Sequence, residues 1–321
     1  MEETSQLTDE ESSVWRHLIA PFWNEKQGRF RAFWRILTAV LVALVSAGVI
    51  GAYTRQALDF PLSSFISNLL AVVSALLILY IWAGYIDHRR FKAFGFRINR
   101  EWIIDLVGGI LIAGVIHLGV FVTHLSLGWI EITGWMFAGS AESFVGGFVL
   151  SLFGFVFVAV WEESIFRGLF LKNAAEGLGS RWVSAKTGII ASWVLVSIIF
   201  GFLHLNQAPS LISIVVWILP GAILGLAYIL TGELGLPIGI HIMYNFALNN
   251  VFGIAGASLG GEVQPSTLIR VSLEGPNGLV GITGIIHLVF GVIGLFLVVG
   301  WVYWRRREVG LRKEIAEWSG S

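Results

Sequence analysis

Apolar residues fall into long runs along this chain, separated by shorter polar stretches, a pattern typical of helices that cross a membrane. Eight runs are long enough to cross a hydrocarbon core of about 30 Å. They cover residues 32–53, 65–86, 102–125, 144–170, 187–204, 210–230, 236–253 and 281–304. The pattern predicts an all-α, polytopic membrane protein with about eight transmembrane helices.

The stretches outside these runs divide the chain into three parts. Residues 1–31 begin with an acidic lead-in that lacks the basic start of a signal peptide, so we expect it to be retained. The second half of this segment mixes aromatic and basic residues, which favours a position at the lipid headgroups. Residues 32–304 form the membrane domain. The basic tail 305–321 suits an anionic cytoplasmic leaflet, and a helix that binds a partner is the alternative.

Composition agrees with a membrane protein and excludes several kinds of chemistry. Hydrophobic residues make up 56% of the chain and charged residues 13%, whereas soluble domains carry about 25% charged residues. The net charge is zero, so we expect no nucleic-acid partner. The apolar runs imply membrane lipid as a partner. The chain has no cysteine, which excludes disulfides, iron–sulfur clusters, thiolate zinc sites and cysteine nucleophiles.

The basic residues predict the orientation in the membrane. If all eight runs cross and the N-terminus is cytoplasmic, every Lys and Arg except Arg55 and Arg270 lies on the cytoplasmic side. Cytoplasmic loops of membrane proteins carry such an excess of basic residues. We therefore expect a multi-pass protein of the cell membrane with both termini in the cytoplasm.

Charged residues interrupt the fourth run, where the sequence reads VAVWEESIFRGLF at 158–170. A charge at the centre of a membrane helix costs about 2.5–3.5 kcal/mol, so each one needs a partner or a function. Glu163 and Arg167 are four residues apart, share a helix face and can pair. Glu162 points about 100° away and has no local cation, which leaves it available as a general base. The alternative is that all three residues mark a solvated helix end.

Two further polar motifs stand in later runs. The fifth run ends in Phe200-Gly-Phe-Leu-His204, and the seventh contains His241-Ile-Met-Tyr-Asn245. The spacing of His241 and Asn245 puts imidazole and amide on one helix face, where they can act as hydrogen-bond donors or as ligands. For each motif alone, a structural hydrogen bond between helices is the competing interpretation.

Taken in order, E-E-x3-R, F-x3-H and H-x3-N resemble the CPBP family, the CAAX proteases and bacteriocin-processing enzymes also called Abi, which include the type II CAAX prenyl endopeptidase. The resemblance covers about residues 145–250 and implies an intramembrane endopeptidase acting on a peptide or lipidated protein, such as a prenylated CAAX-type substrate. By position it implies that Glu162 is the catalytic glutamate and that His204 orients or activates water. It implies that His241 and Asn245 face the carbonyl oxygen. The supporting residues that it implies are Glu163, Arg167 and Phe200.

Two chemical schemes fit these residues. In the first, glutamate activates a water molecule and no cofactor is required. In the second, Glu162, His204 and His241 hold Zn²⁺ as a two-histidine, one-glutamate set. We favour the metal-free scheme, because the chain has no H-E-x-x-H motif and asparagine is an unusual zinc ligand. Either scheme needs water, so we expect a polar cavity open to the cytoplasm.

The run limits conflict with a single site. They put Glu162 near the inner end of its helix and His204 about 25 Å along the next one at 1.5 Å per residue. One of these helices must therefore be longer or shifted.

Two other functions remain open at this point. The chain could be a non-catalytic scaffold or a bacteriocin self-immunity protein of the same fold, or a proton-coupled transporter that uses the same Glu and His residues. The complete set of three motifs favours the protease, since a scaffold does not need them. A transporter more often shows repeated, broken helices, which this sequence lacks.

Overall fold

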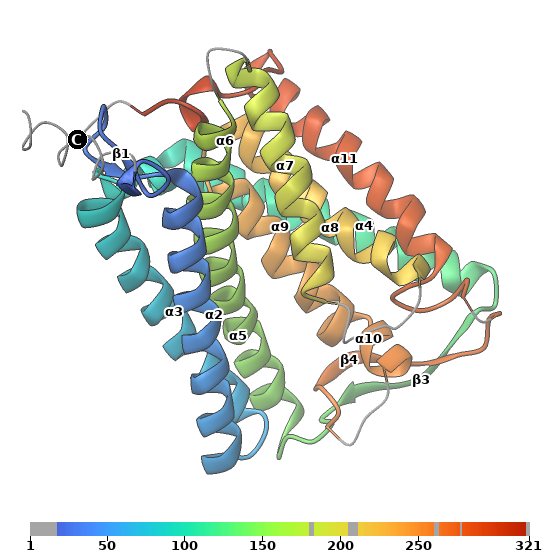
Figure 1. Ribbon diagram of the computed structural model, residues 1–321. Coiled ribbons are helices and arrows are strands. Elements are labelled where there is room, and N and C mark those ends of the chain that lie inside the picture. The colour runs from blue at the N-terminus through green and yellow to red at the C-terminus, as the bar shows by residue number, and fades with distance from the viewer. Residues whose placement is uncertain (1–17, 180–182, 205–210, 260–262, 277, 319–321) are drawn as a thin grey trace, which may run out of the picture.

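The computed structural model describes residues 18–179, 183–204, 211–259, 263–276 and 278–318, and every structural statement below concerns these ranges. The acidic lead-in predicted at the start of the chain lies outside them. The helices form the bundle in Figure 1, which confirms the all-α class. They are α2 (Ala32–Ala57), α3 (Leu62–Ile81), α4 (Arg100–Ser126), α5 (Phe144–Glu163), α6 (Lys172–Leu178), α7 (Ala185–Phe202), α8 (Leu211–Thr231), α9 (Gly235–Phe246), α10 (Ile254–Leu259) and α11 (Ile285–Arg306).

Seven helices of the described part are long and apolar enough to cross a membrane, so the chain is a multi-pass membrane protein. The predicted run at 236–253 is not one of them. It forms α9, which has 12 residues, and then the π-helical turn η5 (Ala247–Val251). Nearly all of α9 is buried. The predicted seventh span is thus a short helix enclosed by the others.

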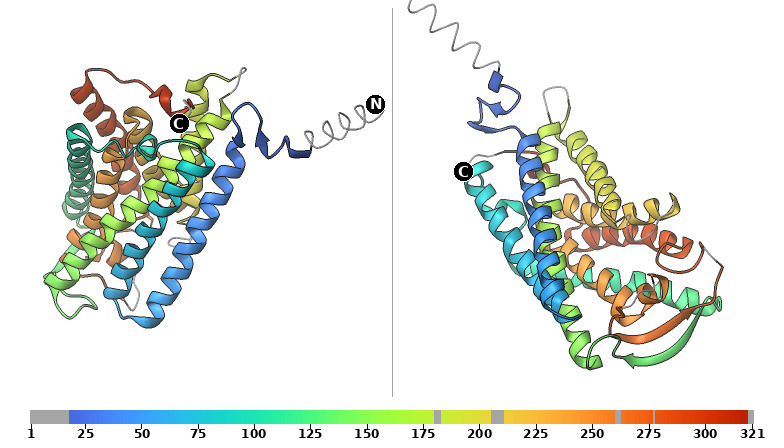
Figure 2. Two further views of the ribbon diagram at one scale, coloured as in Figure 1. Left: turned by 90° about the vertical axis from the view of Figure 1, so that its left-hand side faces the viewer. Right: turned by 60° about the horizontal axis from the view of Figure 1, so that its bottom comes forward.

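Helices α2, α3 and α5 lie side by side as one layer, and the remaining long helices pack beside them (Figures 1 and 2). The start of α2 and the end of α11 lie at the same end of the molecule (Figure 1). We call this the terminal end. Two antiparallel strands, β3 (Ile130–Phe137) and β4 (Thr267–Leu273), lie at the opposite end, which we call the strand end.

Helix α5 is longer than predicted. It continues through the π-helical turn η3 (Ser164–Leu171) into α6, giving one helical run of 35 residues, so the predicted end at residue 170 was wrong. The polar residues Lys172 and Asn173 follow the predicted end, and their side chains form hydrogen bonds with protein groups. Lys172 Nζ donates to Glu314 O over 3.1 Å, and Asn173 Nδ2 donates to Asp87 Oδ2 over 2.8 Å. Glu162 therefore lies near the middle of a continuous helix, which removes the conflict over a single site.

A buried ionic cluster holds the terminal end together. Arg35 of α2 pairs with Asp87 and with Glu176 of α6, the latter over 3.0 Å. Arg29 and Arg89 also pair with Glu176. Arg29 lies in strand β2 (Arg29–Phe30), which pairs with β1 (Trp23–Asn24). Burial, and next the charge of Arg35, lower the pKa of Arg29 to about 10, so its charge persists at neutral pH.

The C-terminal tail packs back onto the same cluster. Trp318 Nε1 donates to Asp87 O over 3.2 Å, and Arg312 N donates to Ile229 O over 3.0 Å. Ile315 is 1% exposed. The described part of the tail is therefore a folded extension of the membrane domain, while its contact with a lipid leaflet stays a prediction.

Strands β3 and β4 were not predicted. Segment 127–143 and the long loop 254–280 supply them, and the pairing joins two parts of the chain that are far apart. Both strands alternate polar and apolar residues, as in IEITGW and TLIRVSL, which is the signal of a half-buried strand. The long hydrophobic runs around them masked this short-range pattern.

Glycines bring α9 close to α4. A Cβ on Gly239 would lie 2.0 Å from Leu106 O, and a Cβ on Gly109 would lie 2.3 Å from Leu236 O. Small residues at such contacts let membrane helices approach backbone to backbone. Gly239 and Gly109 therefore fix the position of α9, the helix that carries His241 and Asn245.

Candidate active site

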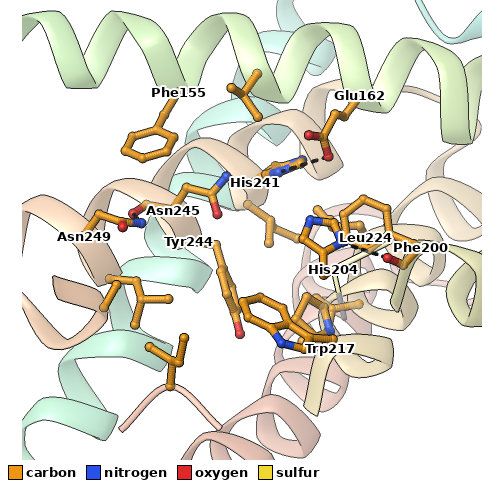
Figure 3. Close-up of a pocket in the computed structure, with 17 residues that line it drawn as sticks. Phe155, Glu162, Phe200, His204, Trp217, Leu224, His241, Tyr244, Asn245 and Asn249 are labelled. Atoms are coloured by element: carbon orange, nitrogen blue, oxygen red, sulfur yellow. Dashed lines mark hydrogen bonds and ion pairs between the residues drawn. The ribbon is translucent and has the colours of Figure 1, made fainter. Parts of the chain in front are cut away.

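A cavity of about 370 Å³ lies among α5, α7, α8 and α9. Glu162, His204, His241 and Asn245 all line it, together with Phe200. Figure 3 shows these polar side chains pointing into the same space from α5, α9 and the turn after α7. Three motifs that are separated in the sequence thus meet in one place, as the resemblance implied.

Glu163 turns away from the cavity into the protein and is fully buried. One of its oxygens, Oε1, takes hydrogen bonds from Arg167 Nη1 over 2.9 Å and from His241 Nδ1 over 2.8 Å. Because a carboxylate bound to a guanidinium can only accept here, Nδ1 of His241 must carry the hydrogen. Glu163 therefore holds the His241 ring so that Nε2 faces the cavity.

Arg167 is fully buried and has few other partners. Its Nη2 donates to Gly221 O over 3.2 Å, and its guanidinium lies over the Phe200 ring at 4.4 Å. The predicted Glu163–Arg167 pair is present. It lies at the start of η3, and such wide helical turns are frequent at functional sites.

Glu162 differs from its neighbour in exposure and in its contacts. Its side chain is 15% exposed, whereas that of Glu163 is 0% exposed. Its Oε2 has no hydrogen-bond partner and lies 3.8 Å from His241 Nε2, too far for a direct hydrogen bond. A buried carboxylate oxygen that faces a polar cavity without a partner marks a place for a water molecule.

His204 approaches the cavity from the turn after α7. Its Nδ1 donates to Phe200 O over 2.8 Å, because a carbonyl can only accept, so Nε2 is left for the cavity. The imidazole stacks on Trp217 of α8 with ring centroids 5.4 Å apart. The carbonyl and the indole together hold the ring in one orientation.

Asn245 lies one turn beyond His241 on the cavity face of α9. Its side-chain amide makes no hydrogen bond to the described residues, although its backbone carbonyl accepts from Asn249 Nδ2 over 2.8 Å. Asn245 therefore offers an N–H donor to whatever enters the cavity.

The zinc alternative requires three ligands around one point. Among the described residues, no three His, Asp or Glu side chains come together in a way that could hold a metal ion. Glu162, His204 and His241 share the cavity without forming such a set. The donors present do not fit a preassembled zinc site, and no step below passes through a metal.

Residues 144–247 match the family model described as type II CAAX prenyl endopeptidase Rce1-like. This segment contains the glutamate pair, His204, His241 and Asn245. The match covers about a third of the chain and supports an assignment of this segment to the CAAX protease family. It also supports a function of the CAAX-type intramembrane protease kind, which implies a lipid environment and a protein substrate. No curated protein and no solved structure matched the chain.

Several residues of this cavity were not predicted from the sequence. Asn249 lines it four residues after Asn245, and Tyr244 and Trp217 form part of its wall. Asn249 continues the i,i+4 series of His241 and Asn245, so this signal was readable. Trp217 carries no such signal, because its place depends on how α8 packs against the turn after α7.

Proposed function

We propose that this protein hydrolyses a peptide bond of a membrane-associated protein, with a prenylated CAAX-type sequence as the candidate substrate, by means of a water molecule that Glu162 activates. The observation that carries the proposal is the different setting of the two glutamates. Glu163 is 0% exposed and its Oε1 binds Arg167 and His241, whereas Glu162 is 15% exposed, lines the cavity and makes no hydrogen bond to the described residues. A free carboxylate in hydrogen-bond reach of a bound water is what general-base catalysis needs.

The proposed water lies between Glu162 Oε2 and His241 Nε2. These atoms are 3.8 Å apart, so one water at about 2.8 Å from each can bridge them. Glu162 takes a proton from this water, and the oxygen attacks the carbonyl carbon of the substrate. When the C–N bond breaks, Glu162 returns the proton to the leaving nitrogen.

Asn245 is the proposed donor to the oxyanion. The family resemblance implies that both His241 and Asn245 face the carbonyl oxygen. The geometry refines this assignment, because His241 Nε2 lies 3.8 Å from Glu162 Oε2, whereas the Asn245 amide makes no hydrogen bond to the described residues. We therefore assign His241 to the water and Asn245 Nδ2 to the oxyanion. His204, whose Nε2 also faces inward, orients the water or the substrate.

The experiment is cleavage of a peptide panel by purified protein in detergent, read by mass spectrometry. The panel includes farnesylated peptides that end in a CAAX sequence and the same peptides without the lipid. Wild type and Glu162→Gln are compared, each with and without a zinc chelator. We expect cleavage by the wild type with or without chelator, and none by the variant.

Each other outcome has a definite meaning. Equal cleavage by both proteins would contradict the role of Glu162. Cleavage abolished by the chelator and restored by Zn²⁺ would replace the metal-free scheme. If neither protein cuts any peptide and both bind them equally, a non-catalytic role of the same fold gains support.

A further inference from the structure

A second, smaller cavity adjoins the catalytic one. It has a volume of about 240 Å³ and lies between α3 and α5. Phe155 and Asn249 line both cavities, so these two side chains form the wall that the cavities share. Figure 3 shows Asn249 and Phe155 at the side of the catalytic cavity away from His204.

Most of the residues that line this second cavity are apolar, but three asparagines and two serines lie among them, and none of the lining residues is charged. Asn68 of α3 makes no hydrogen bond to described residues and lies against Gly154 of α5, where an added Cβ would be 3.7 Å from its Nδ2. Asn250 is fully buried, and its Oδ1 has no partner. An unpaired buried amide oxygen costs about 1–3 kcal/mol. The Asn68 amide and Asn250 Oδ1 are therefore uncharged groups that can form further hydrogen bonds.

The spacing of these amides fits an extended polypeptide. His241, Asn245 and Asn249 follow one another at intervals of four residues along one face of α9 and η5, and Asn68 stands across the shared wall. A peptide backbone offers alternating N–H and C=O groups, which neutral amides can both accept from and donate to. A lipid tail or an isoprenyl chain could contact the apolar part of the lining but could not form hydrogen bonds with these amides.

We propose that the polypeptide part of the substrate runs from the catalytic cavity past Asn249 into the cavity between α3 and α5, where Asn68 and Asn250 bind its backbone. This inference rests on the proposed protease function and names the path of its substrate. It makes Asn249 and Asn68 residues that bind substrate away from the scissile bond.

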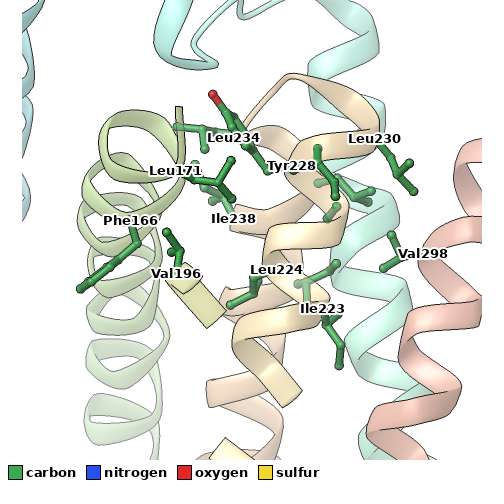
Figure 4. Packing of buried hydrophobic residues seen from close by; sticks show 14 of the residues in the cluster. Phe166, Leu171, Val196, Ile223, Leu224, Tyr228, Leu230, Leu234, Ile238 and Val298 are labelled. Carbon is green, nitrogen blue, oxygen red and sulfur yellow. The ribbon is translucent and has the colours of Figure 1, made fainter. Parts of the chain in front are cut away.

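The path also has a direction. The second cavity includes Pro265, which precedes β4, and the catalytic cavity includes Ala255 and Ile282, so both extend toward the strand end. Toward the terminal end, apolar core residues fill the space beside the site, including Phe166, Leu171 and Leu234 (Figure 4), each at most 2% exposed. We therefore expect the bound polypeptide to extend toward the strand end.

Peptide binding to the uncleaving Glu162→Gln protein tests the path. An extended chain advances about 3.3 Å per residue, so a peptide with about ten residues beyond the scissile bond passes the second cavity and one with about two does not. Two nested series of fluorescein-labelled farnesylated peptides are used. One series ends in CAAX and is lengthened upstream of the scissile bond, and the other is lengthened downstream of it and therefore has no C-terminal CAAX. We expect the long peptide of one series to bind more tightly than the short one, and Asn68→Leu to reduce this advantage about threefold to tenfold.

The matched control is Leu70→Ala, on the lipid-facing side of the same helix and 44% exposed, which should preserve the advantage. A second measurement avoids reliance on the folding of Asn68→Leu. Because the chain has no cysteine, Asn68→Cys creates a single thiol, and a long peptide should protect it from maleimide while a short one does not. Leu70→Cys should show no protection.

Failure of the path and failure of the protease function give different results. Binding that is independent of length in both series, or Asn68→Cys that no peptide protects, would overturn the path even if the wild type cleaves. Binding that depends on length and on Asn68, in a wild type that cleaves nothing, would support the path and remove the proposed chemistry.

Discussion

Replacing the buried partner glutamate separates its structural role from its role in catalysis. Glu163→Met leaves Arg167 without its counter-charge at a site where the side chain is 0% exposed. At 2.9 Å and an effective dielectric constant of about 20, the attraction lost is about 6 kcal/mol before desolvation. Removing one partner of a buried pair costs about 3–5 kcal/mol overall, and we expect a loss of that size in the free energy of unfolding.

The double variant Glu163→Met/Arg167→Met removes both charges. Replacing a buried pair by apolar side chains of similar size is often neutral, so we expect the double variant to regain most of the lost stability. It should not regain activity, because His241 Nδ1 has lost the oxygen that orients the ring. A misplaced catalytic group costs about 10²-fold in rate, and kcat should fall by at least that factor.

The assay combines denaturant unfolding in mixed micelles with cleavage rates for the single and double variants. Arg167→Met is the second single variant and completes the cycle. Recovery of both stability and wild-type kcat in the double variant would refute the inference that Glu163 positions His241. An equal loss of stability in the double variant and the single variants would refute the inference that Glu163 and Arg167 compensate each other's buried charge.

Three further predictions concern other parts of the structure. Asn245→Ala should fold normally but lower kcat by about 10²–10³-fold, measured on a cleaved peptide, because the oxyanion loses its donor. Gly239→Val should reduce the yield of folded protein, measured by size-exclusion chromatography, because its Cβ would lie 2.0 Å from Leu106 O; Gly300→Ala, whose Cβ meets nothing within 4 Å, is the control. A single cysteine at Trp135 should react with an impermeant maleimide in intact cells and one at Val309 only after lysis, and the reverse pattern would contradict the orientation.

Much of the fold could be predicted from the sequence because hydrophobic run length determines where membrane helices form. All eight predicted runs correspond to helices. The errors in the helix limits arose where residues contact protein instead of water or lipid. The run predicted to end at residue 170 continues, because Lys172 and Asn173 find hydrogen-bond partners, Glu314 O and Asp87, in distant parts of the chain. The short α9 was interpreted as a full span because its burial among other helices has no signature in hydropathy.

The sequence motifs predicted the main polar residues that line the candidate cavity, but only some of the contacts between them. Glu163 and Arg167 are four residues apart on one helix, so their contact follows from helix geometry alone. The hydrogen bond from His241 to Glu163 joins residues 78 positions apart and depends on how α9 packs against α5. The same is true of the second cavity, since Asn68 lies in a helix without any recognised motif.

The most direct test of the account compares the same chemical change at two adjacent positions. Glu162→Gln and Glu163→Gln each replace a carboxylate by an amide, and both proteins are measured for cleavage and for unfolding. We predict that Glu162→Gln keeps wild-type stability and loses about 10²–10⁴-fold in cleavage rate, the usual contribution of a general base. Glu163→Gln should lose stability, because Arg167 then lacks a counter-charge. Cleavage near the wild-type rate by a folded Glu162→Gln protein would contradict the central claim.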